Sequence, residues 1–391
     1  MLCLLTTAGA VTATTWTKGT NSAPATTGDH VADKGWWPTK GTPDAASFLG
    51  DAACLQCHTD MKDFQTGNAM PRAASLGGPP DHTGTASESF RSGTYAYSLV
   101  NGGIGTALQV TAGDTSATFP ISWTFGAGRH GQTYLVENEG TTYEAQVSSF
   151  VTQHLGLTPG HTDLSGSTLP QGIGNRLSAL EKTRCFACHT TAWSDGGKLS
   201  TAKLVPGVHC EACHGPGQQH VTEVRAGRLQ KAAASILNPA RLDPVARNDY
   251  CGACHRTSMD IELNGAPAGL SSIRFQPYRL EKSRCWIATE DVRLSCTGCH
   301  DPHKAVVREA AFYDAKCLAC HTAGAAPVAF GPRTKPEPVR SCPVAKSDCT
   351  SCHMPKYNVP EMHSDFVDHF IRIVRPQPIN GGPVAAAAPH R

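Results

Sequence analysis

The chain has 391 residues, enough for one large domain or two to three ordinary ones. Only 40% of the residues are hydrophobic, while 38 are Gly and 27 are Pro, so the apolar core that the side chains alone can build is thin. The formal charge is +2, from 34 basic and 32 acidic residues. This balance excludes both a basic stripe for nucleic acid and an acidic tail.

The N-terminal segment, residues 1–47, begins with apolar and small residues over positions 1–15 (MLCLLTTAGAVTATT). They have the composition of the end of a secretory signal without its basic residues, so we expect a truncated signal-like start followed by an extended segment. The 17 cysteines indicate a compartment outside the reducing cytoplasm, either periplasmic or extracellular. No stretch approaches 18 consecutive apolar residues, and no membrane span is predicted.

Residues 48–184 contain one C-x-x-C-H motif and then no further cysteine before Cys185. Within them, residues 95–151 are rich in Thr, Val, Tyr and Phe with Gly breaks, which predicts a small β-rich insert of short strands. Gly126, Gly128 and Gly131 match the G-x-G-x-x-G pattern of dinucleotide sites. The residues that follow have the pattern of a strand rather than a helix, so no such site is predicted.

Residues 185–375 contain six more C-x-x-C-H motifs, and residues 376–391 form a tail that we expect to be mobile. Helical periodicity is weak between the motifs, with short helical stretches predicted at residues 221–234 and 364–374. Cys285 and Cys342 lie outside the motifs. They are either joined in a disulfide or present as buried thiols.

The seven motifs, numbered 1–7 in chain order, share two cysteines three residues apart and a histidine directly after the second. In such segments both thiols add to the vinyl groups of a haem, and the imidazole binds the iron from the same side. Zinc knuckles need no histidine after every second cysteine, and a disulfide framework leaves seven histidines unexplained. We therefore predict seven covalent haem c groups. The proximal iron ligands are His58, His189, His214, His255, His300, His321 and His353, and the attachment residues are Cys54, Cys57, Cys185, Cys188, Cys210, Cys213, Cys251, Cys254, Cys296, Cys299, Cys317, Cys320, Cys349 and Cys352.

Seven porphyrins would fill an interior that the apolar side chains cannot fill. The predicted fold is mostly α and irregular, with a haem-dominated core and little regular secondary structure. The predicted organisation is a first haem with the β-rich insert at residues 48–184 and a six-haem cluster at residues 185–375.

Each iron needs a second axial ligand, and eleven histidines lie outside the motifs. His303 follows His300 by three residues, so their Cα atoms are at most about 11 Å apart, slightly short of the span across a haem. We therefore expect His303 to serve a neighbouring haem. His220, six residues after His214, is expected to reach across a haem pair in the same way.

Two haems have an uncertain second ligand. For motif 1 we favour His130 or His82 over Met70, because imidazoles are in surplus. For motif 4 no spare histidine is near in sequence, so a distant one such as His363 or His154 is expected. Met259 or an open iron is the alternative there.

Several phrases carry a family resemblance: GAGRHGQTYL (126–135), GLTPGH (156–161), CEACHGPGQQH (210–220), SRCW (283–286), CTGCHDPH (296–303), and CTSCHMPK with the later DHFIR (349–372). Over roughly residues 48–375 the chain resembles bacterial multihaem cytochromes c of the doubled C-x-x-C-H or cytochrome c-554-like kind, which are often joined to tetratricopeptide repeats. The resemblance implies electron transfer. It implies as distal ligands His130, His220, His303 and His369, with His363 next.

The favoured function is an electron carrier whose closely spaced, mainly bis-histidine haems link redox partner proteins, other multihaem cytochromes among them. One alternative is a multihaem oxidoreductase of the nitrite or hydroxylamine type with one five-coordinate haem, which the lack of a C-x-x-C-K variant disfavours. Another is a self-associated filament in which His30 or His390 ligates a haem of the next subunit. No catalytic residue is assigned.

Overall fold

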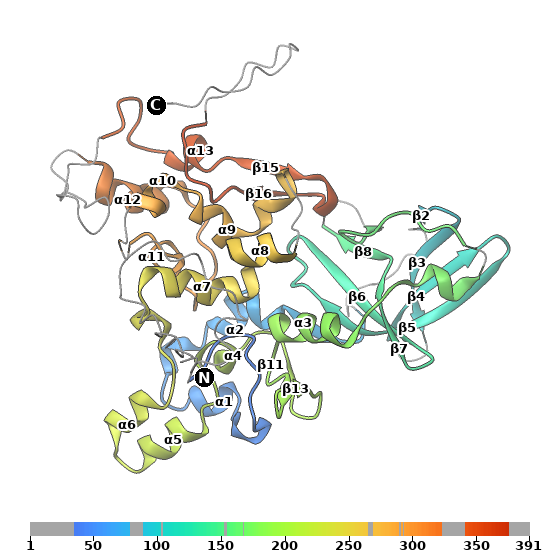
Figure 1. Cartoon of the computed structure of the whole chain (residues 1–391), viewed down its shortest axis with the longest axis horizontal. Helices are drawn as coiled ribbons and strands as arrows, with labels where there is room; N and C mark the ends of the chain where they lie inside the picture. Colours follow the sequence, from blue (N-terminus) through green and yellow to red (C-terminus); the bar gives the residue numbers. More distant parts are fainter. Residues whose placement is uncertain are drawn as a thin grey trace, which may run out of the picture.

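The computed structural model describes residues 35–78, 89–102, 105–151, 155–166, 168–264, 269–288, 291, 293–322 and 341–374. Two parts lie side by side in Figure 1: a β lobe, residues 74–176, and a helical lobe, residues 35–73 and 177–374. The signal-like residues 1–34 and the tail from residue 375 onward lie outside the described residues. Among the helices that are described, none is long and apolar enough to cross a membrane.

Ten antiparallel strands form the sheet of the β lobe. Seven follow one another in the order β10-β7-β6-β5-β4-β3-β2, β1 pairs with β5, and β8 pairs with β6 and β9. Between β6 and β7, Glu139 and Gly140 have φ of 50° and 72°, as a tight two-residue hairpin turn requires. The strands are β1 (Ala74–Leu76), β2 (Phe90–Ser92), β3 (Tyr95–Gly102), β4 (Gly105–Ala112), β5 (Thr115–Phe125), β6 (Gly131–Asn138), β7 (Thr141–Ala145), β8 (Val147–Phe150), β9 (Leu155–Leu157) and β10 (Gly174–Arg176).

The β lobe has an apolar core of its own. Alternate residues of β3, namely Tyr95, Tyr97 and Leu99, are buried against Leu108 and Val110 of β4. Alternation of this kind places every second side chain on one face of a sheet. Thirteen buried residues make up the whole cluster, so the sheet is stabilised by its side chains alone.

The helical lobe consists of short helices joined by turns. Local caps begin some of them: Asp243 accepts the Ala246 amide at 2.8 Å before α7, and Ser178 and Glu181 form a capping box before α3. The helices are α1 (Asp51–Cys54), α2 (Phe64–Gly67), α3 (Ala179–His189), α4 (Cys210–His214), α5 (Gln218–Arg225), α6 (Leu229–Ala234), α7 (Pro244–His255), α8 (Ser258–Asn264), α9 (Gln276–Glu281), α10 (Arg284–Ala288), α11 (Cys296–Cys299), α12 (Ala310–His321) and α13 (Cys349–His353). Three two-stranded ribbons complete it: β11 (Thr190–Thr191) with β14 (Val205–Pro206), β12 (Ser194–Asp195) with β13 (Lys198–Leu199), and β15 (Lys356–Val359) with β16 (Ser364–Val367).

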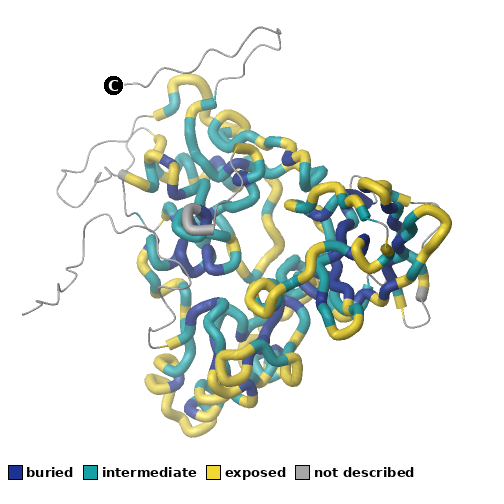
Figure 2. The backbone as a smooth tube through the Cα atoms, turned by 45° about the vertical axis from the view of Figure 1, so that its right-hand side comes forward, coloured by how far each residue is buried: buried dark blue, intermediate teal, exposed yellow. Residues whose placement is uncertain are grey.

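Little apolar side-chain core is present within the helical lobe. Its own buried cluster is Trp37, Tyr250 and Ala253, and most of its described residues are intermediate or exposed (Figure 2). A second cluster, which includes Phe125 of β5 and Phe186 of α3, joins the two lobes. A lobe built around large apolar cofactors needs only a small cluster of apolar side chains, because the cofactors themselves fill the interior.

The prediction of a mostly α and irregular fold with a small β insert at residues 95–151 was wrong. Helix accounts for 37% and strand for 24% of the described residues, and the sheet extends from Ala74 to Arg176. The outlying strands β1, β2, β9 and β10 have three residues each, too few to show an alternating pattern. The helix predicted at residues 364–374 is also absent, because residues 364–367 pair with β15 as a strand.

Candidate haem sites

Motifs 2–7 end a helix or form a short one, and in motif 1 the helix α1 ends at the first cysteine. Motifs 2, 4 and 6 are the last turns of α3, α7 and α12, while motifs 3 and 7 make up α4 and α13. In motifs 1 and 5 the histidine follows the helix and still donates its amide to the first cysteine, at 3.0 Å from His58 to Cys54 and 2.8 Å from His300 to Cys296. Residues three and four apart share one helix face, so both cysteines and the histidine of each motif face the same side.

Backbone carbonyls orient many of the imidazoles. Five rings donate Nδ1–H to a carbonyl: His189 to Ala73 at 3.1 Å, His214 to Leu237 at 2.8 Å, His220 to Ala232 at 2.9 Å, His353 to Arg372 at 3.1 Å, and His369 to Val367 at 3.1 Å. Such a bond fixes the tautomer and leaves Nε2 for a metal, as is usual for metal-binding histidines. The donor set therefore fits haem iron.

Three motif histidines have a second histidine opposite them. The ring centres of His58 and His220 are 6.5 Å apart with planes at 26°, those of His214 and His303 are 6.0 Å apart at 9°, and those of His300 and His369 are 6.3 Å apart at 43°. A metal–imidazole bond of about 2.0–2.1 Å, plus roughly 1.2 Å from nitrogen to ring centre, separates two rings on one metal by about 6.4 Å. The three separations match that distance.

The structure thus places His220 opposite motif 1, where His130 or His82 was favoured. It places His303 opposite motif 3 rather than its own motif 5. His82 lies outside the described residues, as does His154. In the described part of the chain no second histidine ring faces His189, His255 or His353 in this way.

His130 lies in the loop before β6, against the β15–β16 ribbon. Its Nδ1 is 2.7 Å from the Ser364 hydroxyl, and its ring stacks on Phe366 at 4.4 Å. Burial, followed by the nearby Arg308 and Arg129, lowers the pKa of His130. His363 packs edge-on against Phe150 of β8 at 4.7 Å. Both candidates therefore lie where the tip of the ribbon meets the sheet.

Two spare histidines have both ring nitrogens engaged by the protein. His209 contacts Asp51 at 2.6 Å through Nδ1 and the Pro206 carbonyl at 3.0 Å through Nε2. His161 contacts Gln146 at 3.0 Å and Glu144 at 3.1 Å. Neither ring has a nitrogen left for iron, which separates these two from the predicted ligands.

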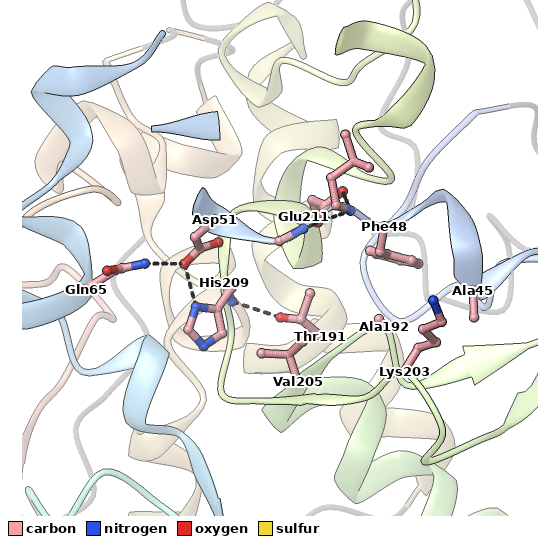
Figure 3. Close-up of a pocket in the computed structure, with 12 residues that line it drawn as sticks. Ala45, Phe48, Asp51, Gln65, Thr191, Ala192, Lys203, Val205, His209 and Glu211 are labelled. Carbon is pink, nitrogen blue, oxygen red and sulfur yellow. Dashed lines mark hydrogen bonds and ion pairs between the residues drawn. The ribbon is translucent and has the colours of Figure 1, made fainter. Parts of the chain in front are cut away.

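A cavity of about 310 Å³ lies between motifs 1 and 3 (Figure 3). Asp51, Gln65, His209 and Glu211 line it together with Phe48 and Val205. The hydrogen bond that His209 donates to Asp51 raises the pKa of His209. Burial alone would raise the pKa of Asp51, but the hydrogen bonds from His209, Gln65 and Cys210 hold it well below its ordinary value.

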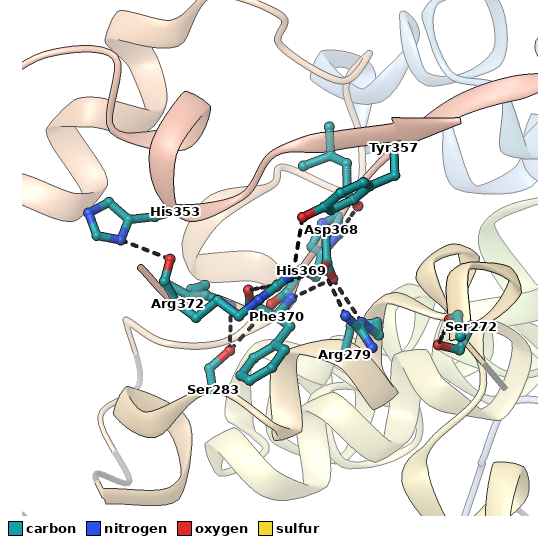
Figure 4. A network of polar contacts seen from close by, with 12 residues as sticks. Ser272, Arg279, Ser283, His353, Tyr357, Asp368, His369, Phe370 and Arg372 are labelled. Atoms are coloured by element: carbon teal, nitrogen blue, oxygen red, sulfur yellow. Dashed lines mark hydrogen bonds and ion pairs between the residues drawn. The ribbon is translucent and has the colours of Figure 1, made fainter. Parts of the chain in front are cut away.

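His369 is positioned by a buried carboxylate (Figure 4). Asp368 accepts two hydrogen bonds from Arg279, at 2.8 and 2.7 Å, and one from Arg372 at 2.6 Å. These bonds outweigh burial and lower the pKa of Asp368. On the other side of His369, Ser283 accepts the Ile371 amide at 2.8 Å, so the backbone on both sides of the imidazole is fixed.

Cysteines of different motifs lie next to one another. Their sulfur atoms stand for the thioether sulfurs of a haem-loaded protein. The adjacent pairs are Cys54 with Cys210, Cys188 with Cys254, Cys251 with Cys296, and Cys317 with Cys349. Motifs 3 and 4 meet where Tyr250 of α7 donates to the Cys213 carbonyl, and motifs 5 and 6 meet where α11 contacts α12. Among the described cysteines no disulfide forms, and Cys285 lies near Cys317 and Cys320 rather than joined to Cys342.

Comparison with known proteins adds a family assignment for part of the chain. Residues 168–215, which contain motifs 2 and 3, match the family model of cytochrome c554 and c-prime. The multiheme cytochrome MtrA of Shewanella baltica (strain OS185) is 23% identical over 187 residues, which are 44% of this chain and 52% of that protein. The chain therefore spans about half the length of this curated relative.

Among solved structures, the outer cell wall cytochrome OcwA aligns with a TM-score of 0.48 at 12% identity, over 84% of this chain and 80% of that one. The family match and the MtrA relative agree with the chemistry of the motifs, which calls for haem c. The motifs, the family match and the MtrA relative together support a multihaem cytochrome c.

Proposed function

We propose that this protein is an electron carrier that holds seven haems c, one at each of motifs 1–7, and passes electrons between partner proteins. Haem c supplies a reversible one-electron iron couple when bound. The observation that carries the proposal is an unbroken series of contacts between motif helices. The helices α1 and α4, α7 and α11, α11 and α12, and α12 and α13 lie in contact, α3 packs against α7, and Tyr250 of α7 donates to the Cys213 carbonyl of α4. The series leads from motif 1 to motif 3, then through motifs 4, 5 and 6 to motif 7, and motif 2 joins it at motif 4.

The two ends of this series are its exposed points. Cys57 of motif 1 and Cys352 of motif 7 are exposed, whereas the other motif cysteines are of intermediate burial. Adjacent attachment points hold their cofactors close together, and electron exchange between cofactors requires that closeness. An exposed motif at each end gives donor and acceptor proteins separate places to bind.

We further propose bis-histidine ligation at three motifs, by the pairs His58 with His220, His214 with His303, and His300 with His369. The support is the agreement of their ring separations with two imidazoles on one iron, together with the backbone carbonyls that bind Nδ1 of His214, His220 and His369 and leave Nε2 for iron. His130 is proposed as a distal ligand for one of the remaining motifs. Its Nδ1 is held by Ser364 and its Nε2 is left for iron.

The location proposed is periplasmic or extracellular, because so many cysteines are typical of oxidising compartments. The partners proposed are redox proteins, multihaem cytochromes among them, since the MtrA relative is itself named a multiheme cytochrome. Membership of the doubled C-x-x-C-H group is part of the same proposal. It is supported by the adjacent first cysteines of motif pairs such as 6 and 7.

The decisive experiment combines haem counting with carbon monoxide binding. Mass spectrometry of the purified holoprotein should show seven covalent haems, and the reduced protein should bind no carbon monoxide, because six-coordinate low-spin iron has no free position. One equivalent of bound carbon monoxide, lost when the surroundings of His255 are altered, would favour the oxidoreductase alternative. Fewer than seven haems would refute the stoichiometry.

A further inference from the structure

Two aspartates occupy the same position in different motifs, three residues before the first cysteine. Asp51 precedes Cys54 of motif 1, and Asp314 precedes Cys317 of motif 6. Both side chains belong to buried residues, with 9% and 7% of the residue surface exposed. Buried carboxylates need hydrogen-bond partners. In both cases one partner is the first cysteine of another motif.

Asp51 connects motif 1 to motif 3. It accepts the backbone amide of Cys210 at 3.1 Å and the side-chain amide of Gln65 at 2.8 Å. The contact is reciprocated: Glu211, within motif 3, accepts the backbone amide of Gly50 at 2.7 Å, just ahead of α1. Each motif thus supplies a carboxylate to the start of the other.

Asp314 connects motif 6 to motif 7 in the same way. Its two carboxylate oxygens accept the amides of Asp348 at 2.7 Å and Cys349 at 2.8 Å. Cys349 is the first residue of α13, as Cys210 is of α4. Asp51 and Asp314 each lie three residues before one motif and accept the first backbone amide in the helix of another motif.

These helices have no cap of their own. Neither His209 before α4 nor Asp348 before α13 makes a side-chain capping bond, although the first amides of any helix need acceptors. Asp51 and Asp314, which lie far away in the sequence, supply those acceptors, and their negative charge is favourable at a helix N-terminus. The first cysteines of the paired motifs then lie side by side, Cys54 with Cys210 and Cys317 with Cys349.

A third pair shows a related arrangement. Asn248 stands three residues before Cys251 of motif 4, and its carbonyl oxygen is 3.4 Å from the sulfur of Cys296 in motif 5. Its amide group donates to Glu281 at 2.6 Å. Motifs 4 and 5 are therefore joined at the sulfur of Cys296 and not through a backbone amide of motif 5. The two aspartates alone make the amide contact.

We propose that Asp51 and Asp314 are positioning residues for electron transfer, each capping the helix of a second motif and so fixing two haem attachment points as one pair. Motifs 1 and 3 form one pair, and motifs 6 and 7 form the other. The inference rests on the proposed carrier function and deepens it, since the pairing determines which haems exchange electrons most directly.

The test uses holoprotein variants at motif 6. Asp314→Ala removes both acceptor oxygens, Asp314→Asn keeps one, and Asp348→Asn is the control. The control removes the same charge next to α13 from an exposed side chain and leaves the two bonds of Asp314 intact. Hydrogen exchange at residues 348–349 and a spectroelectrochemical titration of the haems are the two measurements.

In Asp314→Ala, exchange at residues 348–349 should accelerate by at least about tenfold, the factor for losing a hydrogen bond to a charged group. Two of the seven haems should shift in potential while haem content stays constant. Asp314→Asn should show a smaller effect of the same kind, and the control should show none. Asp51→Ala should shift a different pair, and the double variant should be additive.

Two results would overturn the proposal. One is faster exchange with an unchanged titration, which would make the cap purely structural. The other is equal behaviour of Asp314→Ala and Asp348→Asn. If Asp314→Ala loses a haem, Asp314→Asn becomes the deciding variant under the same two criteria. A wild-type protein with seven redox-active haems and no response to either aspartate would refute the pairing and leave the carrier function standing.

Discussion

Asp368→Asn should both destabilise the protein and disturb one haem. Asp368 is 0% exposed, and both of its oxygens are used: one accepts Arg279 Nε and the Phe370 amide, and the other accepts Arg279 Nη2 and Arg372 Nη1. An asparagine would point its NH₂ group at guanidinium donors on one side or the other. The buried arginine charge would then lack its partner.

Removing one partner of a buried ion pair costs about 3–5 kcal/mol. At roughly 2–4 °C per kcal/mol for a large domain, the unfolding midpoint should fall by about 6–20 °C. The displaced backbone should also release His369 from its place opposite His300, so one haem of the seven should change its low-spin spectrum. Thermal unfolding and low-temperature EPR of the oxidised holoprotein measure the two effects.

Asp365→Asn is the matched control, because Asp365 is an exposed aspartate three residues earlier on the same ribbon. It should leave both measurements within error of the wild type. The reasoning fails if Asp368→Asn shifts the midpoint no more than Asp365→Asn does. It also fails if stability drops while the EPR spectrum keeps all its wild-type components, since Asp368 would then not position His369.

Three further outcomes are expected. His220→Met and His303→Met should each change the spectrum of one haem and raise its potential, because thioether ligation raises haem potentials, with haem content unchanged by mass spectrometry. His209→Gln should leave every haem spectrum as it is, because both nitrogens of His209 already bond to the protein. The bond to Asp51 raises the pKa of His209 above its ordinary 6.5, so the stability that this pair contributes is complete below about pH 6.5 and is lost as the pH rises through the raised pKa. Over that pH interval the free energy of unfolding, measured with urea, should therefore fall more in the wild type than in His209→Gln.

The motif chemistry was accessible from the sequence because its spacing is local. A helix places residues three and four apart on one face, so C-x-x-C-H determines its own geometry wherever it ends a helix. The strand after Gly131 was predicted correctly for a similar reason, since its pattern lies within the eight residues of β6. The expectation that His220 reaches beyond its own motif came from spacing alone.

The partner of His220 could not be predicted in this way. His58 lies 162 positions earlier in the chain, and the segments that carry the two rings are joined by long-range contacts such as those of Asp51 and Glu211 between motifs 1 and 3. The size of the sheet was missed because its outer strands are stabilised by pairing rather than by their own sequence pattern. Long-range contacts determine both features, and local periodicity carries no information about them.

The β lobe has a large apolar core of its own, whereas the helical lobe has a small one. The β lobe follows motif 1 in the chain and precedes the other six motifs, and its thirteen-residue cluster needs no cofactor. The sheet therefore has an apolar core that does not depend on haem, unlike the lobe that carries the later motifs. The Ala73 carbonyl, directly before β1, accepts both the Gly126 amide at 2.7 Å and Nδ1–H of His189 at 3.1 Å. The sheet thus holds in place the backbone group that orients the histidine of motif 2, and its own core does not depend on haem.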